Sequence, residues 1–205
     1  MKRICYLLFF LLLTGCAQEG VYVMESVPDQ KVKKMEQDVI ANPHDRQLQD
    51  ELIVAYIQNK EYERAQSLLA KLLEHDSMDT TANYLMGLIY LRRNDIDNAQ
   101  TYLEKVIAVN PGHIPSLFSL AVVDEKKNNL ESARKRYQKI LEINPDDGDA
   151  HYNLALLFDK KLFLFRKALY HYRKCVGLYA GNEDKRLIAN LKKRIKELEI
   201  LEKAD

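Results

Sequence analysis

The sequence predicts an all-α fold in which antiparallel helix pairs stack as an α-solenoid, behind a short targeting segment. Small side chains recur every 34 residues, at Ala65, Ala99 and Ala133, and such a period is typical of helical repeats. Prolines, which end helices, stand on the same grid, at Pro43, Pro111 and Pro145. The composition agrees, because 47% apolar residues can build a core, while 7 Gly and 5 Pro exclude collagen-like and low-complexity chains.

The first fifteen residues have the pattern of an export signal. Lys2 and Arg3 give a positive start, and residues 4–13 form an apolar run without a charge. Ten helical residues span roughly half of a ~30 Å hydrocarbon core, so this run is too short for a transmembrane helix. It ends in LTGC at residues 13–16, which resembles the lipobox of bacterial lipoproteins.

The lipobox resemblance implies that residues 1–15 are a lipoprotein signal peptide and that residues 16–28 are a lipidated Cys16 and a tether. Cys16 would carry diacylglycerol and a further acyl chain such as palmitate, and two or more chains hold a protein durably at a membrane. An ordinary signal peptide with a chance cysteine is the alternative. In a Gram-negative source, Ala17 in place of Asp favours the outer membrane, facing the periplasm, while an inner membrane or Gram-positive cell membrane stays open.

Two further columns of the 34-residue grid identify the repeat. One holds Leu52, Met86, Leu120 and Leu154, and the next holds Ile53, Gly87, Ala121 and Ala155. This pattern resembles the tetratricopeptide repeat (TPR), in which small residues lie where helix A meets helix B and a proline ends the unit. Small side chains let antiparallel helices approach closely. The resemblance implies a right-handed superhelix whose concave side is lined mainly by helix A.

The grid divides the mature chain into consecutive elements. We expect an N-terminal half-repeat helix at 29–45, repeats at 46–79, 80–113, 114–147 and 148–181, and a C-terminal capping helix at 182–205. The capping helix has one apolar stripe, and solenoids need terminal caps with a polar outer face. The fourth repeat is degenerate, because Ala168 follows Ala133 by 35 residues and the turn at 161–165 is apolar. We expect this turn to be buried under the last helix; contact with a partner is the alternative.

The TPR resemblance also places three positions of each helix A in a partner-binding groove. The fifth position gives an aromatic ladder, the ninth an apolar floor and the thirteenth a basic margin, suited to a peptide with apolar anchors and acidic residues. The residues are Tyr84, Phe118 and Tyr152, then Leu88, Val122 and Leu156, then Arg92, Lys126 and Lys160. The alternative is that these side chains pack between neighbouring helices A and only set the spacing of the superhelix.

Charge is unevenly distributed although the formal total is +1. Residues 36–104 hold 13 acids and 6 bases, whereas residues 159–196 hold 12 bases and 3 acids. The basic patch comprises Lys160, Lys161, Arg166, Lys167, Arg173, Lys174, Lys192, Lys193 and Arg194. It could meet anionic lipid headgroups or an acidic partner, or be a solvated helix face. With so small a total charge in an exported protein, nucleic acid is not an expected partner.

Residues that carry chemistry are sparse, so we expect no enzyme, no catalytic residues, no metal site and no cofactor beyond the covalent lipid. The five His show no metal-ligand spacing, and Cys175, expected to be a buried thiol, lies on a helix that offers no oxyanion donors. The predicted function is a membrane-anchored scaffold that binds an envelope protein or peptide. It resembles TPR lipoproteins of pilus assembly, such as secretin pilotins and tight-adherence accessory proteins. A regulator of an envelope peptidase or peptidoglycan enzyme in trans is the alternative.

Overall fold

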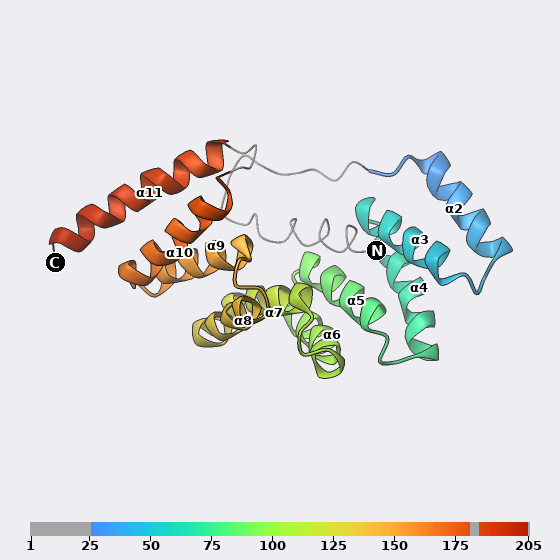
Figure 1. Ribbon diagram of the computed structural model, residues 1–205. Helices are drawn as coiled ribbons and strands as arrows, with labels where there is room; N and C mark the ends of the chain where they lie inside the picture. The colour runs from blue at the N-terminus through green and yellow to red at the C-terminus, as the bar shows by residue number, and fades with distance from the viewer. Residues whose placement is uncertain (1–25, 181–184, 205) are drawn as a thin grey trace. The chain divides into compact units, whose positions relative to one another are not determined.

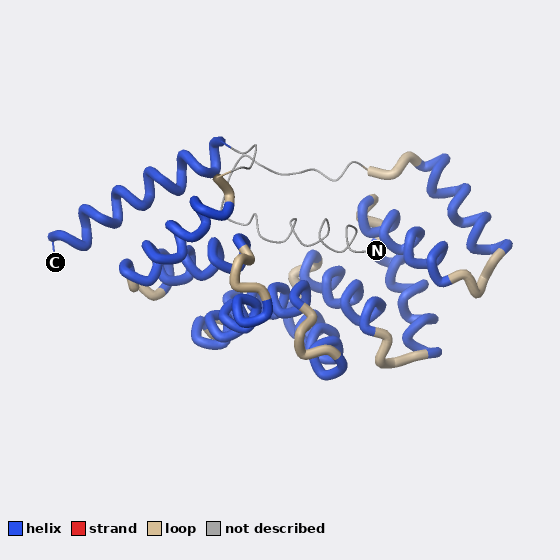
Figure 2. Tube along the Cα trace, in the orientation of Figure 1, coloured by secondary structure: helices blue, strands red, loops and turns tan. Residues whose placement is uncertain are grey.

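The computed structural model describes residues 26–180 and 185–204, and the regular structure within these residues is helical throughout (Figure 2). They form two compact units, the first ending at Ser119 and the second beginning at Leu120, so the division falls within helix α7 (Ile114–Lys126). The predicted all-α fold of paired helices is confirmed. The signal peptide at 1–15 and the lipidation site Cys16 lie outside the described residues.

The described part of unit 1 begins with five successive helices, each of which packs against its neighbour along the chain (Figure 1). It contains α2 (Asp29–Ala41), α3 (Arg46–Gln58), α4 (Tyr62–His75), α5 (Thr80–Arg92) and α6 (Ile96–Val109), followed by the first half of α7. The pairs α3–α4 and α5–α6 lie where the first two repeats were placed, and α2 precedes them as a single helix. Helix α2 packs against α3, and its Val32 is buried. Tyr56 on α3 donates a hydrogen bond to Glu36 on α2 at 3.0 Å.

The helices A begin at capping side chains that recur with the repeat. Asp45, Asp79 and Asp147 each accept a hydrogen bond from a backbone N–H two or three residues further on, at 2.8–2.9 Å. His113 holds the corresponding place before α7, where its Nδ1 accepts from the N–H of Ser116 at 3.3 Å. Each cap satisfies an N–H that the first turn of a helix leaves without a partner, so the caps fix where helix A starts.

The small residues of the grid lie at close helix contacts. Ala65, Ala99, Ala133 and Ala168 on the four helices B are all fully buried. A Cβ added to Gly87 on α5 would meet Cγ of Leu103 on α6 at 2.7 Å, a separation that non-bonded carbons do not tolerate. The absence of a side chain at Gly87 therefore sets the distance between the two helices.

Unit 2 continues the pattern with one irregularity. After the second half of α7 it contains α8 (Leu130–Ile143), α9 (Gly148–Leu156), the π-helix η1 (Leu157–Lys161), α10 (Phe165–Leu178) and α11 (Lys185–Ala204). The helix A of the fourth repeat thus ends in a π-turn, where the Leu162 N–H donates to the Leu157 carbonyl at 3.0 Å. A π-turn accommodates one extra residue, which accounts for the spacing of 35 residues in this repeat.

The apolar turn of the fourth repeat is not buried under the last helix, and that prediction is wrong. The side chain of Phe163 is 67% exposed and that of Leu164 is 42% exposed. Helix α11 instead contacts α10 and reaches η1 through Arg194, which leaves the tip of the turn uncovered. Leu162 and Phe165, which flank the tip, are half-buried.

A buried ion pair joins α11 to the π-helix. Asp159 is only 1% exposed, and its two carboxylate oxygens accept hydrogen bonds from Nη2 and Nε of Arg194 at 2.7 and 2.9 Å. The hydroxyl of Tyr172 on α10 donates to the same carboxylate at 3.1 Å. Leu191 and Leu198 bury the apolar stripe of α11 on either side of Arg194. The capping helix is thus held by apolar contact and by one buried charge pair.

Candidate partner-binding surface

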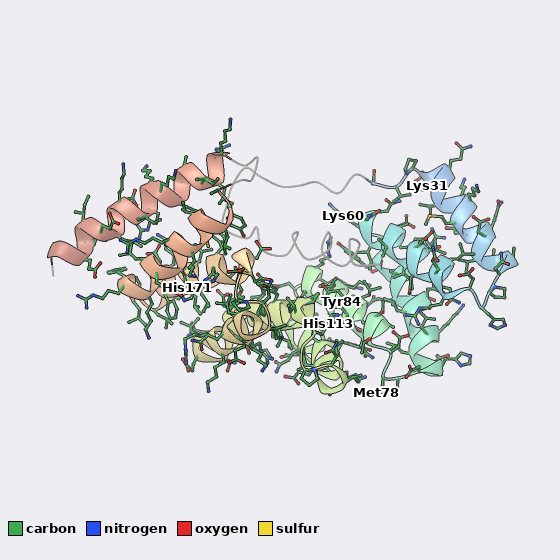
Figure 3. All side chains as sticks on the ribbon, in the orientation of Figure 1. Lys31, Lys60, Met78, Tyr84, His113 and His171 are labelled. Carbon is green, nitrogen blue, oxygen red and sulfur yellow. The ribbon has the colours of Figure 1, made fainter. Side chains whose placement is uncertain are left out.

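In unit 1, the helix A positions expected to line a groove are mostly core. Tyr84 and Phe118 are each 2% exposed and Leu88 is fully buried, so the expected exposure of the two aromatic residues is wrong. The ring of Tyr84 packs edge-on against His113 in the turn before α7, with centroids 5.3 Å apart (Figure 3). Tyr84 therefore packs against the start of the next helix A, as the alternative interpretation held.

The cause is the sequence of α5, which lacks a polar side. Residues 82–89 and Leu91 are all buried, and a helix that is apolar all round is buried on all faces. Even its polar member Asn83 is buried, donating from Nδ2 to the carbonyl oxygens of Ser77 and Asp79 at 3.0 and 2.8 Å. The sequence signal for burial is that almost no polar residue stands between positions 82 and 91, so this helix has no face suited to solvent.

Arg92 is the exception at the end of α5. Its side chain is half-buried, and its Nε and Nη2 atoms are buried without a hydrogen-bond partner among the described residues. Buried guanidinium donors are nearly always paired in folded proteins. The thirteenth position of this repeat therefore has unused donor capacity that suits a carboxylate.

In unit 2 the same positions are accessible. Tyr152, Val122 and Leu156 are half-buried, while Lys126 and Lys160 are exposed. We call these five residues the unit 2 helix A surface. The ammonium of Lys160 lies 3.4 Å from the carboxylate of Asp159, which is already held by Arg194. The surface combines half-exposed apolar groups with two cations, the combination that the sequence predicted for the groove as a whole.

The predicted basic patch is partly neutralised within unit 2. Arg166 pairs with Glu202 at 2.7 Å and Arg173 with Glu199 at 2.6 Å, and both arginines remain exposed. Arg194 pairs with the buried carboxylate of Asp159. The prediction that it belongs to an exposed basic patch is therefore wrong. The other members, which keep exposed side chains, are Lys160, Lys161, Lys167, Lys174, Lys192 and Lys193. Sequence reasoning missed the acidic partners because they lie 26 to 36 residues away along the chain.

Comparison with known proteins decides the nature of the repeats. Two tetratricopeptide repeat models match the chain, one over residues 51–114 and the other over residues 90–157. The chain contains tetratricopeptide repeats. Together the matched segments cover more than half of it, including both helices of the second and third repeats.

Solved structures similar to this TPR chain include several of the protein MamA. A structure of MamA residues 41 to the end from Desulfovibrio magneticus RS-1 has a TM-score of 0.66 at 18% identity, covering 89% of this chain and 97% of that one. A MamA AMB-1 structure has a TM-score of 0.62 at 25% identity, covering 74% and 89%. These likenesses show a shared fold. No curated protein sequence matches the chain.

The thiol of Cys175, on α10 of this TPR chain, is buried in surroundings that oppose its reactivity. Burial and the nearby charge of Asp149 raise the pKa of the Cys175 thiol to about 12, and its Sγ lies 3.5 Å from the Gly148 carbonyl oxygen. A buried thiol that stays protonated is a poor nucleophile, which agrees with its expected structural role.

The neighbouring histidines His151 and His171 and the rest of the described chain offer no metal site. His151 and His171 share one hydrogen bond between their Nδ1 atoms, 2.8 Å apart, and Nε2 of His151 lies 3.1 Å from the Pro145 carbonyl oxygen. Across residues 26–180 and 185–204 there is no group of three or more His, Cys, Asp or Glu suited to a metal. In the same ranges, no helix is long and apolar enough to span a bilayer.

Proposed function

We propose that this TPR chain is a protein-interaction scaffold of the bacterial cell envelope, held at a membrane by lipid on Cys16. Its partner is a protein or peptide of the envelope, in the assembly of a pilus or secretion machinery. The lipid anchor is argued from the positive start, the short apolar run and the LTGC motif at residues 13–16. Localisation at the outer membrane, facing the periplasm, follows from Ala17 for a Gram-negative source.

The proposed binding of a partner protein or peptide is argued from the unit 2 helix A surface. Lys126 and Lys160 stand 34 residues apart and are both exposed, with half-buried Val122, Tyr152 and Leu156 beside them in the repeat. Helical repeats present such stacked positions as extended binding surfaces. A peptide with an apolar anchor and acidic residues would bury the ring of Tyr152 and pair with the two ammonium groups.

Site-specific photocrosslinking in cells tests the interaction. A photoreactive residue at Lys126 should capture a discrete partner, which mass spectrometry identifies as a component of an assembly machinery or as an envelope enzyme. Lys139 provides the matched control, because it is also an exposed lysine of unit 2 but lies on helix B α8, where it pairs with Glu142. Equal capture from positions 126 and 139, or capture from neither, would refute the proposed surface.

The anchor is tested separately. The Cys16→Ser variant should lose incorporation of labelled palmitate and either leave the membrane fraction or accumulate as unprocessed precursor. A mature mass and fractionation identical to those of the parent chain would show that Cys16 is not lipidated. Because Cys175 is buried, it does not offer a second acylation site that would mask the result.

A further inference from the structure

Each of the four turns that join helix A to helix B contains one residue in the left-handed backbone conformation. These residues are Lys60, Asn94, Asn128 and Phe163, with φ between 53° and 62°. Left-handed backbone conformations suit glycine and are tolerated by asparagine, but they are unfavourable for a bulky aromatic residue. The first three turns use Lys or Asn at this place, and only the fourth holds an aromatic side chain there.

The hydrogen bonds of the turns show that the left-handed residue is required. In the first three turns the next residue donates its N–H to a carbonyl five residues back, as Glu61 does to Tyr56 at 2.8 Å. In the fourth, Leu164 donates to the carbonyl of Phe158, six residues back, at 2.8 Å. Such closure ends a helix through a left-handed residue, so Phe163 cannot relax without opening the turn.

Burial does not offset this strain. The Phe163 side chain is 67% exposed and Leu164 is 42% exposed, so the described fold gains little from their apolar surface. The fold needs a left-handed residue here but not an aromatic one, since Asn94 and Asn128 hold the same place in other turns. A strained side chain that the fold does not need is a reason to look for a binding role. Two apolar side chains at the tip of a tight turn form a protrusion rather than a cleft.

Cations flank the protrusion on both sides. Lys161 precedes it, Arg166 and Lys167 follow it, and all three are exposed. The Arg166 side chain is 86% exposed even with its partner Glu202 at 2.7 Å, so this pair is readily exchanged for another anion. The Lys167 ammonium lies 5.5 Å from the ring centroid of Phe158.

From these features we infer that the turn at residues 161–165, the fourth-repeat tip, inserts Phe163 into the surface of an anionic membrane. The phenyl ring and Leu164 would enter the headgroup region while the flanking cations meet lipid phosphates, since interfacial binding combines buried apolar area with attraction to anionic lipid. A protruding apolar tip enters a soft lipid layer without needing a complementary pocket. The inference rests on the proposed membrane location, and it adds a second contact to the lipid anchor.

A single fluorophore tests the insertion. The chain has no Trp, so Phe163→Trp introduces one reporter at the tip. The mature chain from residue 16, carrying Cys16→Ser and therefore no lipid, is mixed with vesicles of phosphatidylglycerol and phosphatidylethanolamine at low salt. The emission should shift to the blue and be quenched by lipids brominated near the headgroup, and both effects should weaken at high salt or with phosphatidylcholine vesicles. Unchanged emission with anionic vesicles at low salt would overturn the inference.

Two further variants separate insertion from charge attraction and from misfolding. Phe163→Asn gives the fourth turn the same residue that the second and third turns have at this position. This variant should keep or raise the melting temperature and should weaken vesicle binding about tenfold or more. Lys135→Gln with Lys139→Gln removes two exposed charges of α8, and it should bind nearly as the parent does. Vesicle binding by Phe163→Asn equal to the parent would refute insertion. Since the assayed protein has no acyl chain, this result is independent of whether Cys16 is lipidated in cells.

Discussion

Replacing Arg194 by Gln should release the capping helix α11 from the fourth repeat. Arg194 supplies two hydrogen bonds to Asp159, which is 1% exposed, while Tyr172 supplies one more. Without the guanidinium, a buried carboxylate would keep only the Tyr172 hydroxyl and the Lys160 ammonium, which lies 3.4 Å away. A buried charge that loses its partner is strongly destabilising, because its desolvation is no longer compensated.

The size of the effect follows from burial. Breaking a fully buried ion pair costs about 3–5 kcal/mol, and the 27% exposure of the Arg194 side chain and the nearby Lys160 reduce this to about 2–3 kcal/mol. That free energy corresponds to roughly 30- to 150-fold more α11 in the undocked state. Because repeat proteins are held mainly by contacts between neighbours, the loss should stay within α11 and the repeat beside it.

Hydrogen exchange of the amides in residues 185–204, followed by mass spectrometry, measures this population. Arg173→Gln is the matched control, since Arg173 also bonds an acid of α11, Glu199 at 2.6 Å, but is 59% exposed. Exposed pairs contribute about 0–1 kcal/mol, so the control should speed exchange only a few-fold. If the two variants accelerate exchange equally, the argument from burial is wrong.

Two other predictions follow from side-chain packing and burial. Gly87→Ala should destabilise the chain by about 1–3 kcal/mol, because the added Cβ would overlap Leu103. Gly177→Ala is the control and should not destabilise the chain, because nothing lies within 4 Å of a Cβ at that position. Thermal melting of the two variants measures the difference. Burial and the charge of nearby His151 lower the pKa of His171 to about 4, so the unfolded chain binds more protons below about pH 6.5 and stability falls towards pH 4. The drop in urea midpoint between pH 7 and pH 5 should shrink in His171→Gln. Stability falling with rising pH would contradict this sign.

The sequence predicted the helix positions well because the repeat columns are fixed by side-chain size and backbone properties. Ala99 and Gly87 are small where two helices touch, and a Cβ at Gly87 has no room. The capping residues Asp45, Asp79 and Asp147 stand on the same grid and fix the starts of helices A. Such constraints act within a few residues or between adjacent helices, and a period of 34 makes them visible.

Exposure was predicted less well, because a repeat column does not say what covers it. Tyr84 and Tyr152 share one column, yet the first is buried and the second half-exposed. The difference comes from neighbouring helices rather than from the column. Arg194 was assigned to a basic surface because its partner Asp159 lies 35 residues away along the chain. A charge count along the chain cannot reveal such a pair.

The one extra residue of the fourth repeat connects its structural and proposed roles. The π-helix η1 holds Asp159, which Arg194 of α11 reaches. It also takes up the extra residue, so that Phe163 stands at the left-handed position of the turn. If the insertion served only to dock α11, a turn ending in Asn at that position would suffice, as it does in the second and third repeats. The aromatic residue at the tip is therefore a separate feature, and the membrane contact proposed for it does not depend on the function of the ion pair.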